Sequence, residues 1–213
     1  MITEPGTAIT SDDLPARWDT LLPGQPELGR DVLRRWSEPH RHYHTTEHLA
    51  HVLAMINELT MINERELTEV RLAAWFHDAV YVIGAPDNES ASAALAANAL
   101  DGLVQRPDEV ARLIMVTADH RPRPDDRSGA LLCDADLAIL ASAPAAYDNY
   151  VAQVRAEYAA VADDAFTAGR LTVLTALRAE ELFHTERGRA LRTQARANLD
   201  REIADLTAKL NGG

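Results

Sequence analysis

Histidine and aspartate residues recur along this chain at positions from which they could bind a metal ion. His77 and Asp78 are adjacent in the apolar stretch LTEVRLAAWFHDAVY, and His48 lies upstream in the segment HRHYHTTEHLAH. His120 in VTADH and Asp136 in LLCDADLAIL follow downstream. Imidazole nitrogens and carboxylate oxygens bind divalent ions, and helical domains build such centres from several helices. A lone His-Asp pair is common, but this ordered set is specific enough to predict a metal centre.

The hydrophobic pattern before the His-Asp pair predicts that it lies on the inner face of a helix. His77 shares one helical stripe with Val70, Ala73 and Ala74, so its side chain is expected to point inward. A buried carboxylate such as that of Asp78 is costly unless it is paired or bound to a cation. A purely structural role is therefore the less favourable interpretation of this pair.

The first and last positions of the set are weaker evidence when taken alone. His48 lies on the same side of its expected helix as Val52 and Met55, and a histidine on an apolar face is usually an ordinary core residue. Asp134 and Asp136 are two residues apart and cannot share a helical face. At most one of these two aspartates is expected to bind the ion, while the other caps the helix or supports the ligands.

The elements that position these residues are all expected to be helices, because helix-forming residues dominate and no alternating strand pattern is present. The sequence predicts an all-α, single-domain bundle over 14–213, after a disordered tail over 1–13. The metal-site core is expected over about 40–142, and the C-terminal helices over about 144–210. The predicted helices span about 14–22, 27–37, 46–62, 66–82, 90–100, 107–120, 130–142, 144–161, 166–184 and 187–210.

Composition limits the classes of partner. The 213 residues carry a formal net charge of −12, which argues against binding to a nucleic acid polymer, since that requires a basic face. No secretory signal and no run of about 18 apolar residues is present, so neither export nor a membrane is expected. The single Cys133 excludes an intrachain disulfide and is compatible with a cytoplasmic location.

The order His, His-Asp, Asp on successive helices resembles the signature of the HD-domain superfamily of metal-dependent phosphohydrolases. RHYHTTEHL, AAWFHDAVY, DNESAS, VTADH and CDADLAIL look like one bacterial branch of that superfamily. The likeness continues through YDNYVAQVRAEY, FTAGRLTVL and QARANL, and it covers roughly residues 14–205.

The resemblance implies an HD-type helical bundle and a hydrolase that acts on phosphate esters. By position, it makes His48, His77, Asp78 and Asp136 the metal ligands. It makes His120 the additional histidine that in several subfamilies holds a second metal or a phosphate.

Four basic side chains are candidates for binding a phosphate group: Arg41, His44, His120 and Arg155. Arginine forms bidentate pairs with phosphate oxygens. Arg41 and His44 belong to the same histidine-rich segment, where His44 could instead support the ligands. For Arg155, an internal salt bridge between the C-terminal helices is an equally good interpretation.

The expected cofactor is one divalent ion or two, of Mn²⁺, Fe²⁺, Co²⁺, Ni²⁺, Zn²⁺ or Mg²⁺, because the ligands are nitrogen and oxygen atoms. Such an ion lowers the pKa of a water molecule and so provides a nucleophile for hydrolysis. A general acid must protonate the leaving group. Asp78 and Glu89 are the candidates, although Glu89 could simply be a carboxylate favoured at a helix N-terminus.

The sequence predicts hydrolysis of a small phosphorylated metabolite or nucleotide and leaves two alternatives open. One is a non-catalytic sensor that retains the metal and nucleotide pocket, and the other is an HD-type di-iron oxygenase. No P-loop, dinucleotide-binding or serine-hydrolase motif is present. The C-terminal helix could mediate a homodimer or only cover the core.

Overall fold

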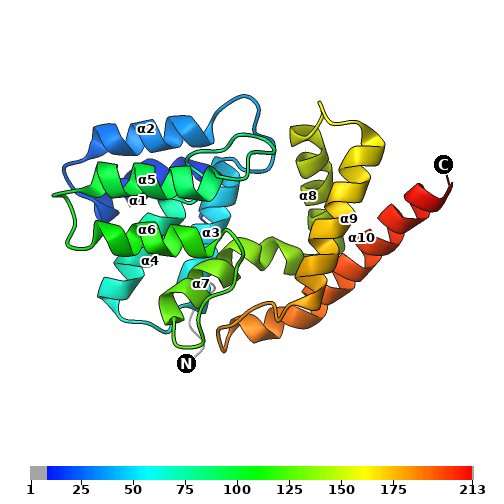
Figure 1. Ribbon diagram of the computed structural model, residues 1–213. Coiled ribbons are helices and arrows are strands. Elements are labelled where there is room, and N and C mark those ends of the chain that lie inside the picture. The colour runs from blue at the N-terminus through cyan, green and yellow to red at the C-terminus, as the bar shows by residue number, and fades with distance from the viewer. Residues whose placement is uncertain (1–8, 213) are drawn as a thin grey trace. The chain divides into compact units, whose positions relative to one another are not determined.

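The computed structural model describes residues 9–212, which form ten α-helices, three short 3-10 helices and no strand (Figure 1). The predicted all-α class is therefore confirmed. The chain divides into two compact units, Met1–Asp136 and Leu137–Gly213. This division lies close to the boundary expected between the metal-site core and the C-terminal helices. The two units are described separately below.

The expected disordered tail over 1–13 corresponds only in part to the structure. Residues 1–8 lie outside the described residues, whereas Ser11–Asp13 form the 3-10 helix η1. The carboxylate of Asp13 accepts hydrogen bonds from both the backbone N–H and the hydroxyl of Thr10, each at 2.9 Å. This reciprocal cap orders the chain before the first α-helix.

Seven α-helices make up the N-terminal unit. Pro26 and Pro107 occupy the first positions of α2 and α6, where proline is preorganised for a helix and its missing N–H costs nothing. Thr45 and Asn63 cap α3 and α4 with side-chain oxygens. The helices are α1 Leu14–Leu21, α2 Pro26–Trp36, α3 Thr46–Leu59, α4 Glu64–Phe76, α5 Asn88–Leu100, α6 Pro107–Val116 and α7 Arg127–Asp136.

Among the helices that end earlier than the sequence predicted, α4 and α6 have candidate site residues near their ends. The expected helix 66–82 ends at Phe76, and a tight turn follows, in which the Ala79 N–H donates to the Phe76 carbonyl at 3.0 Å. The expected helix 107–120 ends at Val116, after which His120 adopts a left-handed conformation with φ of +54°. Apolar residues (AVYVI) continue after the His-Asp pair, so hydrophobic periodicity does not reveal the end of α4.

Tryptophan side chains form the centre of the N-terminal core. The ring of Trp18 meets that of Trp75 edge to face at 5.0 Å between centroids. Trp36 donates its indole N–H to the Trp75 carbonyl at 2.9 Å. Gly29 lies so close to Trp18 that an added Cβ would be 2.3 Å from the indole ring. The two N-terminal helices can therefore pack together only because position 29 has no side chain.

The C-terminal unit is held by a buried polar network across three helices. The Glu202 carboxylate accepts hydrogen bonds from the Tyr147 hydroxyl at 2.5 Å and from Arg170 at 2.9 Å. Asn198 donates to the carbonyls of Leu140 and Ser142, each at 2.9 Å. The unit contains η2 Leu137–Ala141, α8 Pro144–Glu157, α9 Asp163–Ala179, η3 Gly188–Leu191 and α10 Arg192–Gly212.

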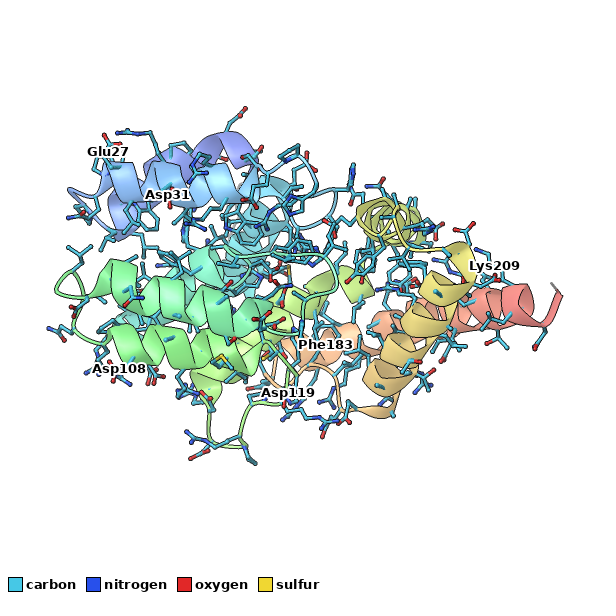
Figure 2. The ribbon with its side chains drawn as sticks, turned by 45° about the horizontal axis from the view of Figure 1, so that its top comes forward. Glu27, Asp31, Asp108, Asp119, Phe183 and Lys209 are labelled. Atoms are coloured by element: carbon cyan, nitrogen blue, oxygen red, sulfur yellow. The ribbon has the colours of Figure 1, made fainter. Side chains whose placement is uncertain are left out.

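The acidic excess of the chain is spread over helix surfaces. Glu27 and Asp108 are exposed on α2 and α6, and Figure 2 shows them on the outside of the N-terminal unit. Within residues 9–212, no single helix is long and apolar enough to cross a membrane, although the bent pair Arg127–Ala141 and Pro144–Glu157 together meets these criteria of length and composition.

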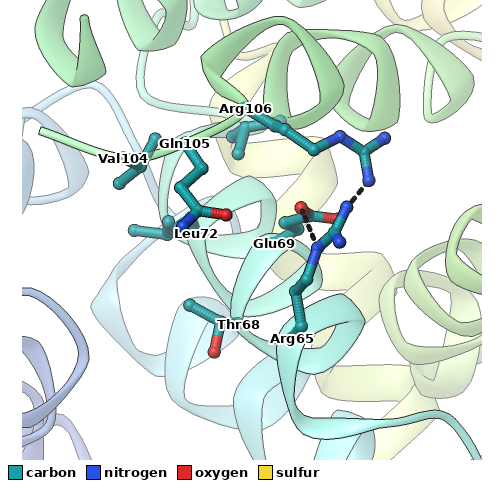
Figure 3. A pocket seen from close by; sticks show the side chains of 8 residues that line it. Arg65, Thr68, Glu69, Leu72, Val104, Gln105 and Arg106 are labelled. Atoms are coloured by element: carbon teal, nitrogen blue, oxygen red, sulfur yellow. Dashed lines mark hydrogen bonds and ion pairs between the residues drawn. The ribbon is translucent and has the colours of Figure 1, made fainter. Parts of the chain in front are cut away.

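A pocket of about 340 Å³ opens on the N-terminal unit between α4 and the start of α6 (Figure 3). Glu69 lies in it, with Arg65 at 3.7 Å and Arg106 at 3.4 Å from its carboxylate oxygens. Leu72 and Val110 provide apolar lining. These ion pairs satisfy the charges of the pocket, and none of the candidate site residues lines it.

Candidate metal centre

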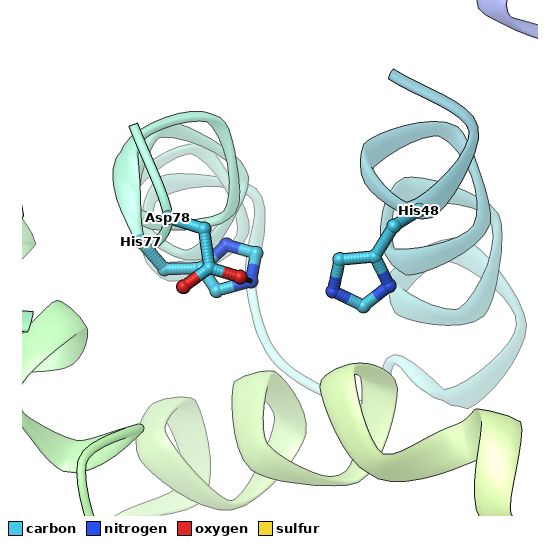
Figure 4. Close-up of side chains that lie close together, drawn as sticks. All are labelled: His48, His77 and Asp78. Carbon is cyan, nitrogen blue, oxygen red and sulfur yellow. Dashed lines mark ion pairs between the residues drawn. The ribbon is translucent and has the colours of Figure 1, made fainter. Parts of the chain in front are cut away.

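Three predicted ligands converge in the N-terminal unit. His48 lies in the first turn of α3, and His77 and Asp78 follow the last residue of α4. One ligand atom from each of the three lies within 4.8 Å of the others. Figure 4 shows His48 pointing from its helix toward the His-Asp pair. The cap at Thr45 fixes the first residue of α3. It thereby fixes the position along the helix from which the His48 side chain points toward the pair.

The ring of His77 is oriented by its own helix. Its Nδ1 lies 2.9 Å from the Ala74 carbonyl, and only a protonated Nδ1 can donate to that oxygen. In the neutral ring, the lone pair is therefore on Nε2. That nitrogen is buried without a hydrogen-bond partner, 3.2 Å from Oδ2 of Asp78 and 3.5 Å from Oδ1 of Asp136. A lone pair directed at two carboxylates is repelled by both, so this position requires a positive charge.

Asp136, the last residue of α7, joins the same group of side chains. Its Oδ1 lies 3.0 Å from Nε2 of His48, and its Oδ2 lies 2.8 Å from Nε2 of His120. These residues form what we call the histidine–aspartate cluster: His48, His77, Asp78, His120 and Asp136. The structure thus brings together all four predicted ligands and the additional histidine.

The pKa values of the cluster reflect the need for positive charge. Burial alone lowers the pKa of His77, but the carboxylates of Asp78 and Asp136 raise it well above its ordinary value. Burial opposes ionisation of both carboxyls, yet the charge of His77 holds the pKa of each below its ordinary value. For His48, burial prevails over the nearby Asp136 carboxylate and lowers the pKa. The two carboxylates are therefore ionised beside a neutral His48.

Exposure increases from one side of the cluster to the other. The side chains of His48 and His77 are 2% and 1% exposed, whereas those of Asp78 and Asp136 are each 14% exposed. His120 reaches 20%. The two carboxylates and His120 are therefore the more accessible members of the cluster. A catalytic metal site needs such access, whereas a closed structural site does not.

His44 stands beside the other carboxylate. Its Nε2 lies 4.0 Å from Oδ2 of Asp78, and its side chain is 22% exposed. Its ring packs against that of Tyr81, with 4.2 Å between centroids and a tilt of 31° between the ring planes. The two partly exposed imidazoles thus lie beside different carboxylates, His44 at Asp78 and His120 at Asp136.

Glu89 and its neighbours occupy the start of α5. Glu89 is half-buried in the first turn of that helix. The adjacent Asn88 binds the backbone of Val82 through both its amide oxygen and its amide nitrogen, at 2.8 and 2.9 Å. Ser92 accepts the N–H of Val80 at 3.0 Å. The DNESAS segment therefore holds the chain that leaves the His-Asp pair.

Arg41 and Arg155 have contacts that differ from the expected phosphate contacts. The Arg41 side chain is completely buried, and its N–H groups are directed at protein oxygens. Arg155 belongs to the C-terminal unit, where it binds Asp163 at 2.5 Å and the carbonyls of Tyr158 and Val161. This geometry favours the internal salt bridge as the role of Arg155 and a structural role near the cluster for Arg41.

Sequence reasoning gave no role to three residues that shape the site. Glu38 binds Arg41, and Asn88 and Ser92 fix the segment after Asp78. Asn88 and Ser92 are four residues apart and therefore share a helical face, which is a detectable signal for polar residues that bind a neighbouring segment. For Glu38, next to a proline at the end of a helix, the sequence offers no comparable signal.

Comparisons of this chain with known protein families, with curated proteins and with solved structures gave no match.

Proposed function

We propose that this chain is a metal-dependent phosphohydrolase of the HD-domain type, which cleaves a phosphoester or phosphoanhydride of a small phosphorylated metabolite or nucleotide. One observation carries the proposal. The buried Nε2 of His77 has no hydrogen-bond partner and faces the oxygens of Asp78 and Asp136. A divalent cation suits this nitrogen and these two carboxylates together.

The four residues that would hold the ion are His48, His77, Asp78 and Asp136. Their nitrogen and oxygen donors, with no thiolate among them, fit Mn²⁺, Fe²⁺, Co²⁺, Ni²⁺, Zn²⁺ or Mg²⁺. When bound, such an ion polarises a phosphate oxygen and lowers the pKa of a water molecule. The hydrogen bond to the Ala74 carbonyl keeps the His77 ring in the orientation that this ligand role requires.

The more exposed residues would serve the substrate. His44 and His120 flank the two carboxylates on the open side of the cluster, and we assign them to the phosphate group. A second ion beside His120 is an alternative use of that residue. A carboxylate that binds a cation accepts protons poorly, so Glu89 is our choice over Asp78 for the acid that protonates the leaving group.

Metal content and phosphate release test the proposal together. The protein would be purified without chelator, its metal measured by elemental analysis, and phosphate release assayed with Mn²⁺, Co²⁺, Ni²⁺ or Mg²⁺. The panel would contain nucleoside mono- and triphosphates, cyclic nucleotides and sugar phosphates. We expect Asp78→Asn and Asp136→Asn to lower metal-dependent release by about 100-fold or more, because even contacts behind metal ligands contribute roughly 10–100-fold.

The matched control is Asp31→Asn, which removes an aspartate that pairs with Arg34 and Arg35 on the surface of α2. It should leave metal content and turnover unchanged. Bound metal without turnover of any compound would replace the phosphohydrolase by a metal-dependent sensor. Paired iron with oxygen consumption would replace it by an oxygenase, and failure to bind metal after reconstitution would refute the metal centre.

A further inference from the structure

Arg41 carries a buried charge immediately beside the proposed metal centre. It lies in the segment between α2 and α3, and its side chain is 0% exposed. A buried guanidinium is costly unless its N–H groups are satisfied. The groups that bind the Arg41 guanidinium therefore indicate why it is buried at this position.

The guanidinium of Arg41 binds two separate parts of the chain. Nη1 donates to the carbonyl of Asp78 at 2.8 Å and to that of His44 at 3.2 Å, and Nη2 lies 3.4 Å from the carbonyl of Ala79. Nε and Nη2 also donate to Oε2 of Glu38, at 3.2 and 3.1 Å. The carboxylate of Glu38 thus fixes the orientation of the Arg41 guanidinium. The remaining N–H groups of the guanidinium donate to backbone carbonyls.

Aromatic rings complete the environment of this charge. The guanidinium carbon lies 5.6 Å from the ring centroid of Trp36 and 5.3 Å from that of Tyr81. Both distances are within the range of cation–π attraction. Trp36 also lies close to the ring of His77, at 5.3 Å between centroids. The Arg41 guanidinium and the proposed metal ligand His77 therefore pack near the same indole ring.

Two of the carbonyls that Arg41 binds, those of Asp78 and Ala79, lie just beyond the end of α4 at Phe76. The last carbonyls of α4 are already bound, that of Trp75 by the Trp36 indole N–H and that of Phe76 by the Ala79 N–H. The arginine therefore binds the segment that follows, where a cation also interacts favourably with the helix dipole. Arg41 supplies the donors from a different segment, so the chain can leave the helix at the position of Asp78. The third carbonyl, that of His44, belongs to the segment that leads into α3.

We propose that Arg41, held by Glu38, is a positioning residue for the metal centre: it fixes the backbone after α4 so that His77 and Asp78 face His48. This inference rests on the proposed metal-dependent function. A lysine cannot replace Arg41 in this role, because a single ammonium group lacks the planar fork that reaches several oxygens at once.

Cobalt binding tests the role directly, since the visible absorption of Co²⁺ reports the geometry of its ligands. Arg41→Lys and Glu38→Gln would be titrated with Co²⁺ beside the unmodified protein. We expect roughly 10–100-fold weaker binding in Arg41→Lys, a smaller loss in Glu38→Gln, and an altered cobalt spectrum in both. Far-UV circular dichroism would establish that each variant is folded.

The control is Arg170→Lys, which changes a largely buried guanidinium that binds Glu202 and Tyr150 in the C-terminal unit. It should lower thermal stability and leave the cobalt affinity and spectrum unchanged. If the variants at positions 41 and 38 bind Co²⁺ with the affinity and spectrum of the unmodified protein, the positioning role is overturned. The proposed metal centre is not affected by that result. Absence of Co²⁺ binding by the unmodified protein would overturn both. If Arg41→Lys does not fold, Glu38→Gln decides the question.

Discussion

At the scale of single residues, the histidine–aspartate cluster combines charges that are compatible only around a cation. Asp78 and Asp136 are ionised, and Nε2 of His77 lies between their oxygens. A proton on His77 provides one positive charge, whereas a divalent ion provides two and also accepts the lone pair of His48. The sequence predicted that these side chains come together, because their types and order are informative. It could not predict the roles of Arg41 and Glu38, which depend on where α4 ends.

The left-handed backbone of His120 leads to a prediction at this scale. Its φ of +54° is unfavourable for residues with a Cβ and costless for glycine, and the difference is of the order of 1 kcal/mol. Both His120→Ala and His120→Gly lose the hydrogen bond to Asp136 and should weaken phosphate binding equally. His120→Gly should nevertheless be about 1 kcal/mol more stable than His120→Ala in urea unfolding. A more stable alanine variant would show that this backbone conformation is absent in solution.

At the scale of the helices, the sequence predicted the elements better than their ends. The sequence predicts that α7 begins near residue 130, whereas it begins at Arg127. The reason is Asp126, whose Oδ1 accepts the N–H of Gly129 at 2.9 Å and whose carboxylate also binds Arg112 at 2.6 Å. The Asp126 side chain is held both by the Gly129 N–H and by Arg112 of α6. An interaction with a residue of another helix cannot be predicted from local sequence. The position of Asp136 depends on this interaction, because it lies at the other end of the same helix.

Asp126 should contribute pH-dependent stability. Burial raises its pKa, but hydrogen bonds from Arg112 and from the Gly129 N–H, together with the charges of Arg112 and Arg123, lower the pKa below its ordinary value. Glu109 shares Arg112 from the same side. A lowered carboxyl pKa stabilises the folded protein above the unfolded pKa of about 3.9, and this contribution is lost as the pH falls through the folded pKa.

The variant Asp126→Asn keeps a capping oxygen and removes the charge. We expect it to lower the free energy of unfolding by about 1.5–3 kcal/mol at pH 7, the range for hydrogen bonds to a charged group. The difference from the unmodified protein should shrink below about pH 4. Urea unfolding at pH 7 and pH 3 measures both values. A difference that is the same at both pH values would mean that the carboxylate charge of Asp126 does not contribute.

At the scale of the whole molecule, the prediction of fold class required only composition and periodicity, whereas the division into units did not follow from them. No change of composition marks the boundary after Asp136, because the chain remains helical from α7 into η2. Each unit has its own buried polar centre. In the N-terminal unit this is the histidine–aspartate cluster, and in the C-terminal unit it is the Glu202–Arg170 network. The first has an unsatisfied nitrogen at its centre and the second is paired internally, which is why only the first suggests a ligand.

This contrast predicts how metal should affect stability. An ion that binds only the folded protein raises the free energy of unfolding by about 2.7 kcal/mol at a concentration 100 times its Kd. Thermal unfolding with Co²⁺ and with chelator should show that increment in the unmodified protein and lose it in Asp78→Asn. Glu202→Gln should unfold at a lower temperature and keep the increment, because independent sites that share no partners contribute additively. A cobalt increment that persists in Asp78→Asn, or disappears in Glu202→Gln, would place the stabilising ion outside the histidine–aspartate cluster.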